Sequence, residues 1–386
     1  MNKNLSPLQC QRDKFDMDSD VLYFNAASKS VILKASVEAG QTGCEAKGKP
    51  WAIDEAARYV QADDIRAQFA AMIGAKADDI AIHPAASYGI ATAAQNLKPK
   101  AGSRILLLEG QFPSNVYAWQ LLANASGATC TMIAWPEDDD WTRAVLEEID
   151  ETVSIAALPP CHWTDGVRLD LVAIGAALKR FDATFVVDAT QWAGALPIDV
   201  NDIHADYLVC AAYKWLLGPY GLSFMYAAPK HQNGRPLEDH LFNHGGVDSI
   251  TSGLGYPEGF TKGARRYDAG EFLNLITLPM IQVALRQIND WQPARIGAYL
   301  SPLIDIVADG AADLGLQIAA PALRSPHILG FRRSGGYPAD ILARLQAEGV
   351  HVSSRGGALR VSPYLCNDAR EAVQLIERIG RVLHKV

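Results

Sequence analysis

The chain contains 386 residues, of which 49% are apolar and 20% are charged, and this composition excludes disordered and fibrous classes of protein. The length suits one large α/β domain together with a smaller domain. A formal net charge of −8, without any block rich in Lys or Arg, argues against binding to nucleic acid or to an anionic membrane surface.

The sequence shows no pattern of a membrane span, a signal peptide or a metal site. No apolar run approaches the roughly 20 residues that cross a bilayer, and residues 1–20 are polar and carry acids, unlike a signal peptide. The six cysteines lie far apart without a CxxC pair, which argues against both zinc and a disulfide framework. We therefore predict a cytoplasmic protein with reduced cysteines, no metal and no membrane contact.

From residue 56 onward, helical spacing of apolar residues alternates with short β-rich runs. The predicted helices are 56–72, 89–97, 115–125 and 171–180. The predicted strands are 80–82, 104–108, 154–158, 184–187 and 207–210. Strands that are apolar on both faces and separated by amphipathic helices are typical of a mostly parallel, doubly wound sheet. In that fold class ligands bind beyond the carboxyl ends of the strands.

This rhythm stops at residues 231–270, a stretch rich in Gly, Asn, Asp, Ser and Pro that is longer than an ordinary loop. A long helix is then predicted over 280–299, followed by strands at 328–331, 350–353 and 358–361 with helices around them. We therefore expect a large domain over 17–280 and a smaller α+β domain over 281–386, which the N-terminal segment 1–16 joins.

Two charged residues follow predicted strands and are candidates for chemistry. Asp188 ends the apolar run 184–187, and Lys214 lies 26 residues later, just past the next strand and among apolar and aromatic neighbours. A lysine in this setting has two interpretations. It extends to the surface, as most lysines do, or it is a desolvated amine whose lowered pKa suits Schiff-base chemistry.

Two turns at strand ends have functional and structural interpretations of their own. Ser87 and Tyr88 lie where a strand joins a helix, and the free N–H groups of such a helix start favour a phosphate. The structural alternative is an ordinary serine N-cap. Phe112, after the following strand, either lies over a flat ring or only packs.

Together these motifs resemble the class V aminotransferase family, whose members are fold-type I enzymes that use pyridoxal 5′-phosphate (PLP). The resemblance extends over most of the chain, from Tyr23 to Pro363. It depends on four motifs, namely Val-Asp-Ala-Thr-Gln at 187–191, Tyr-Lys-Trp at 213–215, Ala-Ser-Tyr-Gly at 86–89 and Phe-Pro-Ser-Asn at 112–115. The family includes cysteine desulfurases, isopenicillin-N-epimerase-like proteins and kynureninase. The implied fold is a mostly parallel doubly wound sheet in a large domain with a smaller α+β C-terminal domain.

The resemblance assigns roles around the PLP ring. Lys214 would form the Schiff base and move the α-proton, and Asp188 would pair with the pyridine nitrogen. Gln191 matches the donor to the ring 3′ oxygen, and Phe112 matches the position that stacks on the ring. His162 falls where desulfurases carry an asparagine beside the cofactor, so it either hydrogen-bonds the 3′ oxygen or is structural.

The resemblance also assigns roles in binding the phosphate and the substrate. Ser87 and Tyr88 match the phosphate-binding turn, and Tyr213 is the one hydroxyl residue just before the lysine. Arg360 matches the arginine that binds the substrate carboxylate through two hydrogen bonds, in a bidentate arrangement. Asn25 is a second predicted substrate contact. Arg355 is interpreted as a rim or structural charge.

Two departures from the family pattern, and one region that matches it, affect these expectations. Ala211 and Ala212 replace the usual phosphate-binding hydroxyl residue, so we expect a homodimer in which a neighbouring subunit completes the phosphate site. Arg266 and Asn274 are weaker candidates in the region that would cross to that neighbour. Residues 351–359 contain no cysteine, which argues against a persulfide-forming desulfurase.

The sequence therefore predicts a PLP-dependent enzyme that acts on an α-amino acid or related amine through an external aldimine. An aminotransferase is the simplest possibility. The alternatives are a lyase or epimerase of the same fold (β-elimination, kynureninase-like cleavage or racemisation), and a catalytically silent PLP-binding protein.

Overall fold

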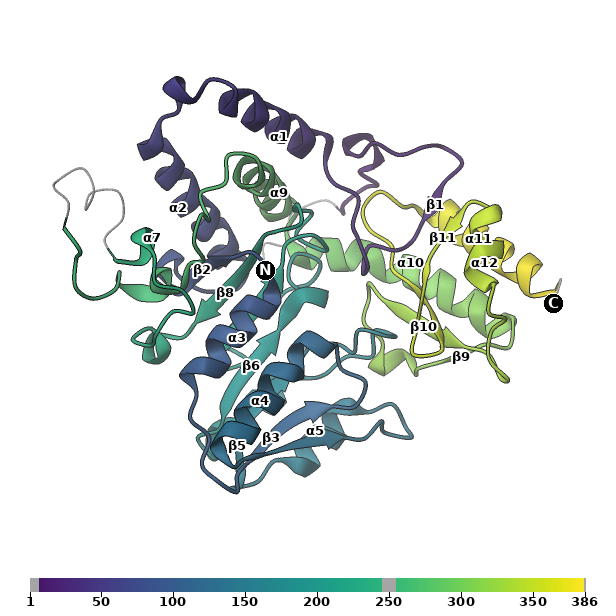
Figure 1. The fold of residues 1–386 in the computed structure, drawn as a ribbon. Coiled ribbons are helices and arrows are strands. Elements are labelled where there is room, and N and C mark those ends of the chain that lie inside the picture. The colour runs from purple at the N-terminus through teal and green to yellow at the C-terminus, as the bar shows by residue number, and fades with distance from the viewer. Residues whose placement is uncertain (1–6, 245–254, 385–386) are drawn as a thin grey trace.

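The computed structural model describes residues 7–244 and 255–384, which form two packed parts around separate sheets (Figure 1). The larger part contains a seven-stranded sheet. In spatial order its strands are β2 (Ile80–His83), β8 (Ser223–Ala227), β7 (Tyr207–Ala211), β6 (Thr184–Asp188), β5 (Val153–Leu158), β3 (Arg104–Leu108) and β4 (Thr129–Ile133). All neighbouring pairs are parallel except those that involve β8, which runs antiparallel to both of its neighbours. The predicted α/β class with a mostly parallel sheet is confirmed.

Helices cover both faces of this sheet, because successive strand residues point to opposite sides. In β3, Leu106 and Leu108 join one hydrophobic cluster, whereas Ile105 and Leu107 join another. The second cluster lies under α3 (Ala86–Asn96) and α4 (Tyr117–Ser126). The first lies under α2 (Glu55–Met72), α5 (Trp141–Glu148), α6 (Leu171–Arg180) and α9 (Thr277–Trp291).

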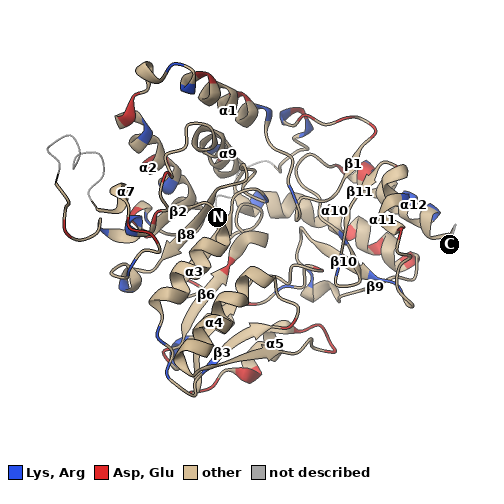
Figure 2. Ribbon diagram, viewed as in Figure 1, with Lys and Arg blue, Asp and Glu red and all other residues tan. Residues whose placement is uncertain are grey.

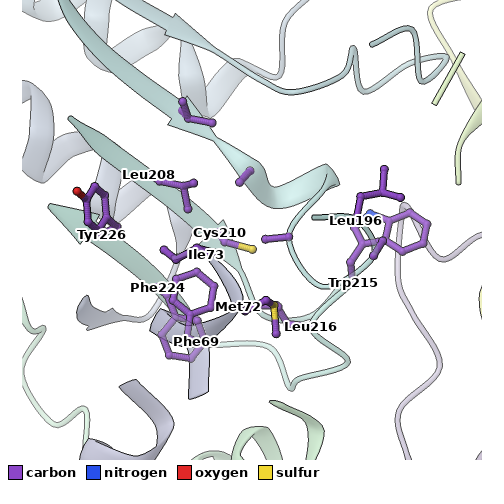
Figure 3. Close-up of a cluster of buried hydrophobic side chains, with 14 of the residues drawn as sticks. Phe69, Met72, Ile73, Leu196, Leu208, Cys210, Trp215, Leu216, Phe224 and Tyr226 are labelled. Atoms are coloured by element: carbon purple, nitrogen blue, oxygen red, sulfur yellow. The ribbon is translucent and has the colours of Figure 1, made fainter. Parts of the chain in front are cut away.

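Figure 3 shows one part of the first cluster, in which buried side chains of β7 and β8 pack together with side chains of α2. Phe69 of α2 stacks on Phe224 of β8, with ring centroids 4.6 Å apart. Leu208 and Cys210 of β7 and the fully buried Trp215 complete this region. The chain around Lys214 is therefore held from behind by close-packed apolar side chains.

The smaller part consists of an antiparallel sheet with α10, α11 and α12 packed against it. Its strands are β12 (Ser353–Arg355), β13 (Ala358–Val361), β10 (Leu329–Arg332) and β9 (Gln317–Ile318), and its helices are α10 (Pro293–Asp313), α11 (Ile341–Ala347) and α12 (Ala369–His384). The chain's N-terminal strand β1 (Leu22–Tyr23) pairs in parallel with β11 (Val350–His351). Figure 1 shows this purple strand among the yellow C-terminal elements.

No single position in the sequence separates the two parts, because segments near the N-terminus and around α9 contact both of them. Phe24 is fully buried in the core of the smaller part, and α9 packs on α1 (Lys34–Lys47) and on α2 in the larger part. Gln11 donates its N–H to the carbonyl of Leu365, at 2.7 Å. The predicted domain limits at residues 17 and 280 stay a prediction.

The helix predicted over 280–299 is wrong as one continuous element. The structure has two helices, α9 and α10, which meet at Gln292. Gln292 has φ +66°, a left-handed conformation that ends a helix, and Pro293 then occupies the first position of α10, where its missing N–H costs no hydrogen bond.

The predicted loop region 231–270 lies partly outside the described residues, since 245–254 are not described. Its described part includes the short helix α7 (Leu241–His244) and a 3₁₀ turn over Gly263–Tyr267. Acidic and basic residues are mixed over both parts of the fold (Figure 2). Among the described residues no helix combines the length and apolar character needed to cross a bilayer.

Candidate active site

A cavity of about 400 Å³ opens at the carboxyl ends of the parallel strands β5, β6 and β7 and at the start of α3. This is the position in which doubly wound sheets bind ligands, and the volume is within the range of cofactor sites. Six predicted site residues line it, namely Ser87, Phe112, Asp188, Gln191, Tyr213 and Lys214. Four others, Asn25, Tyr88, His162 and Arg360, do not. No cluster of potential metal ligands occurs among residues 7–244 and 255–384.

Lys214 lies three residues after β7 and is only 8% exposed. Burial lowers the pKa of Lys214 to about 8, an effect that the nearby Asp188 carboxylate opposes and the Arg360 guanidinium reinforces. Its amine lies 5.6 Å from the ring centroids of both Phe112 and Tyr213. The amine is therefore held in an aromatic-lined setting at a pKa suited to a nucleophile or base near neutral pH.

Asp188 is the last residue of β6, and the strand ends β6 and β7 are tied together beside it. Its Oδ1 accepts a hydrogen bond from the Thr190 N–H at 3.1 Å, and Thr190 Oγ1 accepts one from the Ala211 N–H at 3.1 Å. Burial raises the pKa of Asp188, while the bonds from Thr190 and the charge of Lys214 act in the opposite direction. A carboxylate in this position can bind a cationic group in the cavity.

Gln191 lines the cavity, but its side-chain amide already has two protein partners. Its Nε2 donates to the carbonyl of Ala27 at 3.0 Å, and its Oε1 accepts from Trp215 Nε1 at 2.9 Å. Gln191 thus joins the N-terminal segment to the residue after Lys214. Its predicted bond to the ring 3′ oxygen would have to use the remaining hydrogen of the same amide.

The start of α3 forms one wall of the cavity, where Ser87 lies in the first helical turn. Gly89 lets this helix approach the sheet, because a Cβ there would come within 2.8 Å of Val209 Cγ1. The start of this helix therefore directs its positive dipole end to the cavity, which favours a negatively charged group there. Tyr88 points elsewhere: its ring packs on His83, with centroids 4.7 Å apart, and burial and Glu238 raise its pKa.

Asn115 is a wall residue that sequence reasoning missed. It is 1% exposed, and its Oδ1 accepts from Trp119 Nε1 at 2.9 Å. The Nδ2 of Asn115 is buried without a hydrogen-bond partner in the described part of the chain. An orphaned buried donor in a cavity wall fits an anionic or carbonyl-bearing ligand. The place of Asn115 as the last residue of the Phe-Pro-Ser-Asn motif was the signal in the sequence that could have identified it.

His162 lies outside the cavity, in an aromatic cluster. Its ring stacks on Trp141 at 5.3 Å, its Nε2 donates to the carbonyl of Glu109 at 3.1 Å, and its Nδ1 lies 2.7 Å from Thr164 Oγ1. Burial lowers the pKa of His162 to about 4, so the ring is neutral at physiological pH. The next residue, Trp163, lines the cavity in its place.

Arg360 is 1% exposed, and it is held by neutral groups from three segments of the chain. Its Nη1 donates to the Trp163 carbonyl at 2.5 Å, its Nη2 to Ser28 Oγ at 2.7 Å, and its Nε to Ser353 Oγ at 3.2 Å. No carboxylate oxygen within residues 7–244 and 255–384 lies within 4.0 Å of it. Burial lowers its pKa to about 10. A buried guanidinium without a counter-ion indicates a place for an anionic ligand.

The remaining candidates have structural partners. The backbone of Asn25 forms an isolated parallel β-bridge with Ser362, just beyond β13. The side-chain Oδ1 of Asn25 is a buried acceptor without a hydrogen-bond partner among the described residues. Asn274 Oδ1 accepts from the N–H groups of Ile276 and Thr277, at 2.9 Å each, and so caps the start of α9. Arg266 Nη1 donates to a backbone carbonyl, that of Gly234, at 3.3 Å.

These residues fit PLP. A buried amine of lowered pKa, a carboxylate at a strand end, an aromatic side chain and a helix N-terminus surround one cavity, and Asn115 supplies an orphaned donor. The sequence missed the N-terminal contributions: Ser28 accepts from Arg360, and Ser30 Oγ donates to the Lys214 carbonyl at 2.5 Å.

Comparison with known proteins agrees with this geometry. The sequence model of the family Aminotransferase class-V matches residues 52–372. The uncharacterized aminotransferase YcbU of Bacillus subtilis is 27% identical over 326 residues, which cover 83% of this chain and 84% of that protein. The kynureninase of Deinococcus radiodurans is 28% identical over 235 residues, which cover 58% of this chain and 56% of that protein.

Solved structures show the same fold. The cysteine desulfurase of Thermococcus onnurineus NA1 superposes with a TM-score of 0.83 at 20% identity, covering 99% of this chain and 100% of that one. The cystine C–S lyase C-DES in complex with cysteine persulfide gives a TM-score of 0.83 at 18% identity, covering 94% and 98%. The family match spans most of the chain, and the chain therefore belongs to the class V aminotransferase family and is a fold-type I enzyme with PLP as its cofactor.

Proposed function

We propose that this enzyme is an aminotransferase that takes the amino group from an α-amino carboxylate. The observation that carries the proposal is that Lys214 and Arg360 occur together. The first is a buried amine with a pKa lowered to about 8, and the second is a buried guanidinium without a carboxylate partner among the described residues. The first suits covalent chemistry with an amine substrate, and the second suits binding of the adjacent carboxylate.

The residues around the cavity support separate roles in the proposed reaction. When bound, PLP supplies an electron sink for the bond-breaking step. Lys214 Nζ would accept the proton of the substrate α-carbon and deliver it to the cofactor rather than back to the same carbon, a task that its lowered pKa favours. Asp188, which lines the cavity, would hold a cationic ring nitrogen of the bound cofactor through its carboxylate. The T-shaped pair of Phe112 and Trp163, with centroids 5.4 Å apart, lines one side of the cavity with aromatic rings.

A lyase or epimerase of the same fold is the second candidate, and the kynureninase and C–S lyase relatives support it. A persulfide-forming desulfurase is not supported. The turn between β12 and β13 consists of Gly356 and Gly357 and carries no cysteine. Cys161, Cys210 and Cys366 are buried, and burial raises the pKa of each, that of Cys366 to about 12. None of the three therefore has the thiolate character that a nucleophile needs.

A panel of amino acids given to the PLP-loaded protein tests the reaction type. We expect a keto acid product that depends on an added acceptor keto acid, and a reversible change in cofactor absorbance without an acceptor. Ammonia or inverted stereochemistry as the main product would contradict transamination and support the lyase or epimerase. A cofactor spectrum that no amino acid changes would support the catalytically silent alternative.

The lowered pKa of Lys214 predicts a pH-dependent stability of the PLP-free protein. Burial lowers this pKa from 10.5 to about 8, so between these values the unfolded chain carries a proton that the folded chain has released. The free energy of unfolding therefore rises with pH through this window, by at most about 3 kcal/mol, and is independent of this group below pH 8.

Urea unfolding of the PLP-free protein and of Lys214→Met between pH 7 and 10.5 isolates this contribution. We expect the stability of the native sequence to increase with pH relative to the variant. A difference that stays flat or decreases across the window would show that the amine is not held neutral.

We further propose a homodimer, since Ala211 and Ala212 leave Tyr213 as the one hydroxyl residue just before the lysine for binding the phosphate. Tyr220 lines the cavity, stacks on Tyr213 at 4.4 Å and is still 58% exposed, which places apolar surface at the cavity rim. Light scattering should give twice the chain mass of 41.8 kDa, and dilution should reduce activity and mass together. A fully active monomer would overturn this proposal. The cytoplasmic location stays a prediction.

A further inference from the structure

The hairpin of β12 and β13 places two arginines on one face. Ser353 lies opposite Arg360, and Arg355 lies opposite Ala358. Because alternate residues of a strand share a face, Ser353 and Arg355 lie on the face that also carries Arg360. The bond of 3.2 Å from Arg360 Nε to Ser353 Oγ agrees with this arrangement.

Both guanidinium groups contact the same residue of the cavity wall. Arg360 Nη1 donates to the carbonyl of Trp163, and the Arg355 guanidinium lies 5.9 Å from the centroid of the Trp163 ring. Trp163 itself lines the cavity, edge-on to Phe112. Arg355 and Arg360 therefore both adjoin the Trp163 wall of the cavity that Lys214 lines.

Neither arginine has an acidic partner within residues 7–244 and 255–384. The hydrogen bond of Arg355 goes to the carbonyl of Ser354 at 2.8 Å, and no carboxylate oxygen lies within 4.0 Å of it. The buried Arg66, in contrast, forms an ion pair with Asp268 at 2.6 Å. A buried charge normally has such a partner, whereas Arg360 is buried without one among the described residues and the neighbouring Arg355 is half-buried without one.

The charges around the cavity add up to an excess of positive charge. Within the described residues, Asp188 and Lys214 are the charged side chains that line it, and Arg360 and Arg355 add two positive charges beside its Trp163 wall. The charge of Arg355 contributes to lowering the pKa of both Arg360 and Lys214. Binding of one α-carboxylate would neutralise Arg360 alone and leave Arg355 unpaired.

We propose that the preferred substrate carries a second acidic group, as a dicarboxylic amino acid or its sulfinate analogue does. Arg360 binds the α-carboxylate, and Arg355 binds the distal acid across Trp163. This inference depends on the proposed function, because it specifies the substrate class for the same site. The alternative is that Arg355 only packs on the Trp163 ring.

Absorbance titrations of the PLP-loaded protein with matched amino acids test the proposal. The pairs are aspartate with asparagine and glutamate with glutamine, and cysteine sulfinate distinguishes a sulfinate from a carboxylate. We expect each acid to bind about ten- to hundredfold more tightly than its amide, the range for a hydrogen bond to a charged group. Arg355→Gln should remove most of this ratio, and Arg355→Lys should restore part of it.

The matched control is Arg370→Gln, which removes the same charge from an exposed position on α12 and should keep the ratio. Calorimetry with succinate and with butyrate gives a readout that needs no reaction. Succinate should bind more tightly, and only when Arg355 is present.

The outcomes separate the two proposals. Equal affinities for acids and amides in the native protein would overturn this inference and leave transamination standing. An Arg355→Gln variant that loses affinity for alanine as strongly as for aspartate would also overturn it. If succinate binds through Arg355 but no amino acid changes the cofactor spectrum, the acid site is supported and the proposed function fails.

Discussion

Replacing Lys214 with alanine is expected to abolish covalent attachment of PLP and to lower turnover about 10²- to 10⁴-fold, the usual contribution of a positioned acid–base group. The reason is that Lys214 is the one amine in the cavity wall, judged over the described chain. Borohydride reduction followed by peptide mapping locates the attachment, and steady-state kinetics gives the loss.

The control for this experiment is Lys98→Ala, which removes an exposed lysine at the end of α3. It should retain both the label on Lys214 and normal turnover. A reduced adduct on any other lysine of the native protein would refute the assignment of Lys214.

The second large effect is expected from Arg360→Lys, which should weaken amino-acid binding by about one to two decades and leave PLP absorbance intact. A lysine ammonium keeps the charge but lacks the rigid fork that holds the bonds to Trp163, Ser28 and a carboxylate at once. Turnover should also fall, because the substrate is no longer held in a reactive orientation. An absorbance titration with the preferred amino acid measures both effects.

Arg360→Ala separates ligand binding from stability. Since no carboxylate of the described residues contacts Arg360, its loss breaks only bonds to neutral groups, and the fall in melting temperature should be small beside the loss of affinity. Unchanged affinity in Arg360→Lys would refute the carboxylate role. A large loss of stability without loss of affinity would show that Arg360 serves the interface between the two parts.

The sequence was sufficient to predict the strand ends that carry chemistry. The runs that become β6 and β7 are apolar at every buried position, so their place in the sheet interior, and that of Asp188 and Lys214 beyond their ends, followed from pattern alone. The pattern did not reveal β8, because this strand returns antiparallel without an intervening helix and breaks the alternation on which the prediction depends.

The direction of side chains could not be predicted. His162 and Trp163 are neighbours in sequence, but the stacking of His162 on Trp141 turns the histidine away and leaves the tryptophan at the cavity. Long-range partners were equally hidden, since Ser28 and Arg360 are 332 residues apart. Periodicity reports which face of an element is buried, and it carries no information on which distant segment covers that face.

The pairing of β1 with β11 has a consequence for how this protein is made. Leu22 pairs with Val350, and the adjoining segment supplies Ser28 to Arg360 and Ser30 to Lys214. At 5–20 residues per second, a ribosome needs roughly 15 to 65 seconds to make the chain between Leu22 and Val350. All strands of the larger sheet have been synthesised well before then. The segment that contacts Lys214, however, can take its final place only after the last strands of the chain have been made. A chain released early would therefore display Leu22 and Phe24 to chaperones and proteases, and it would lack a finished site for its cofactor.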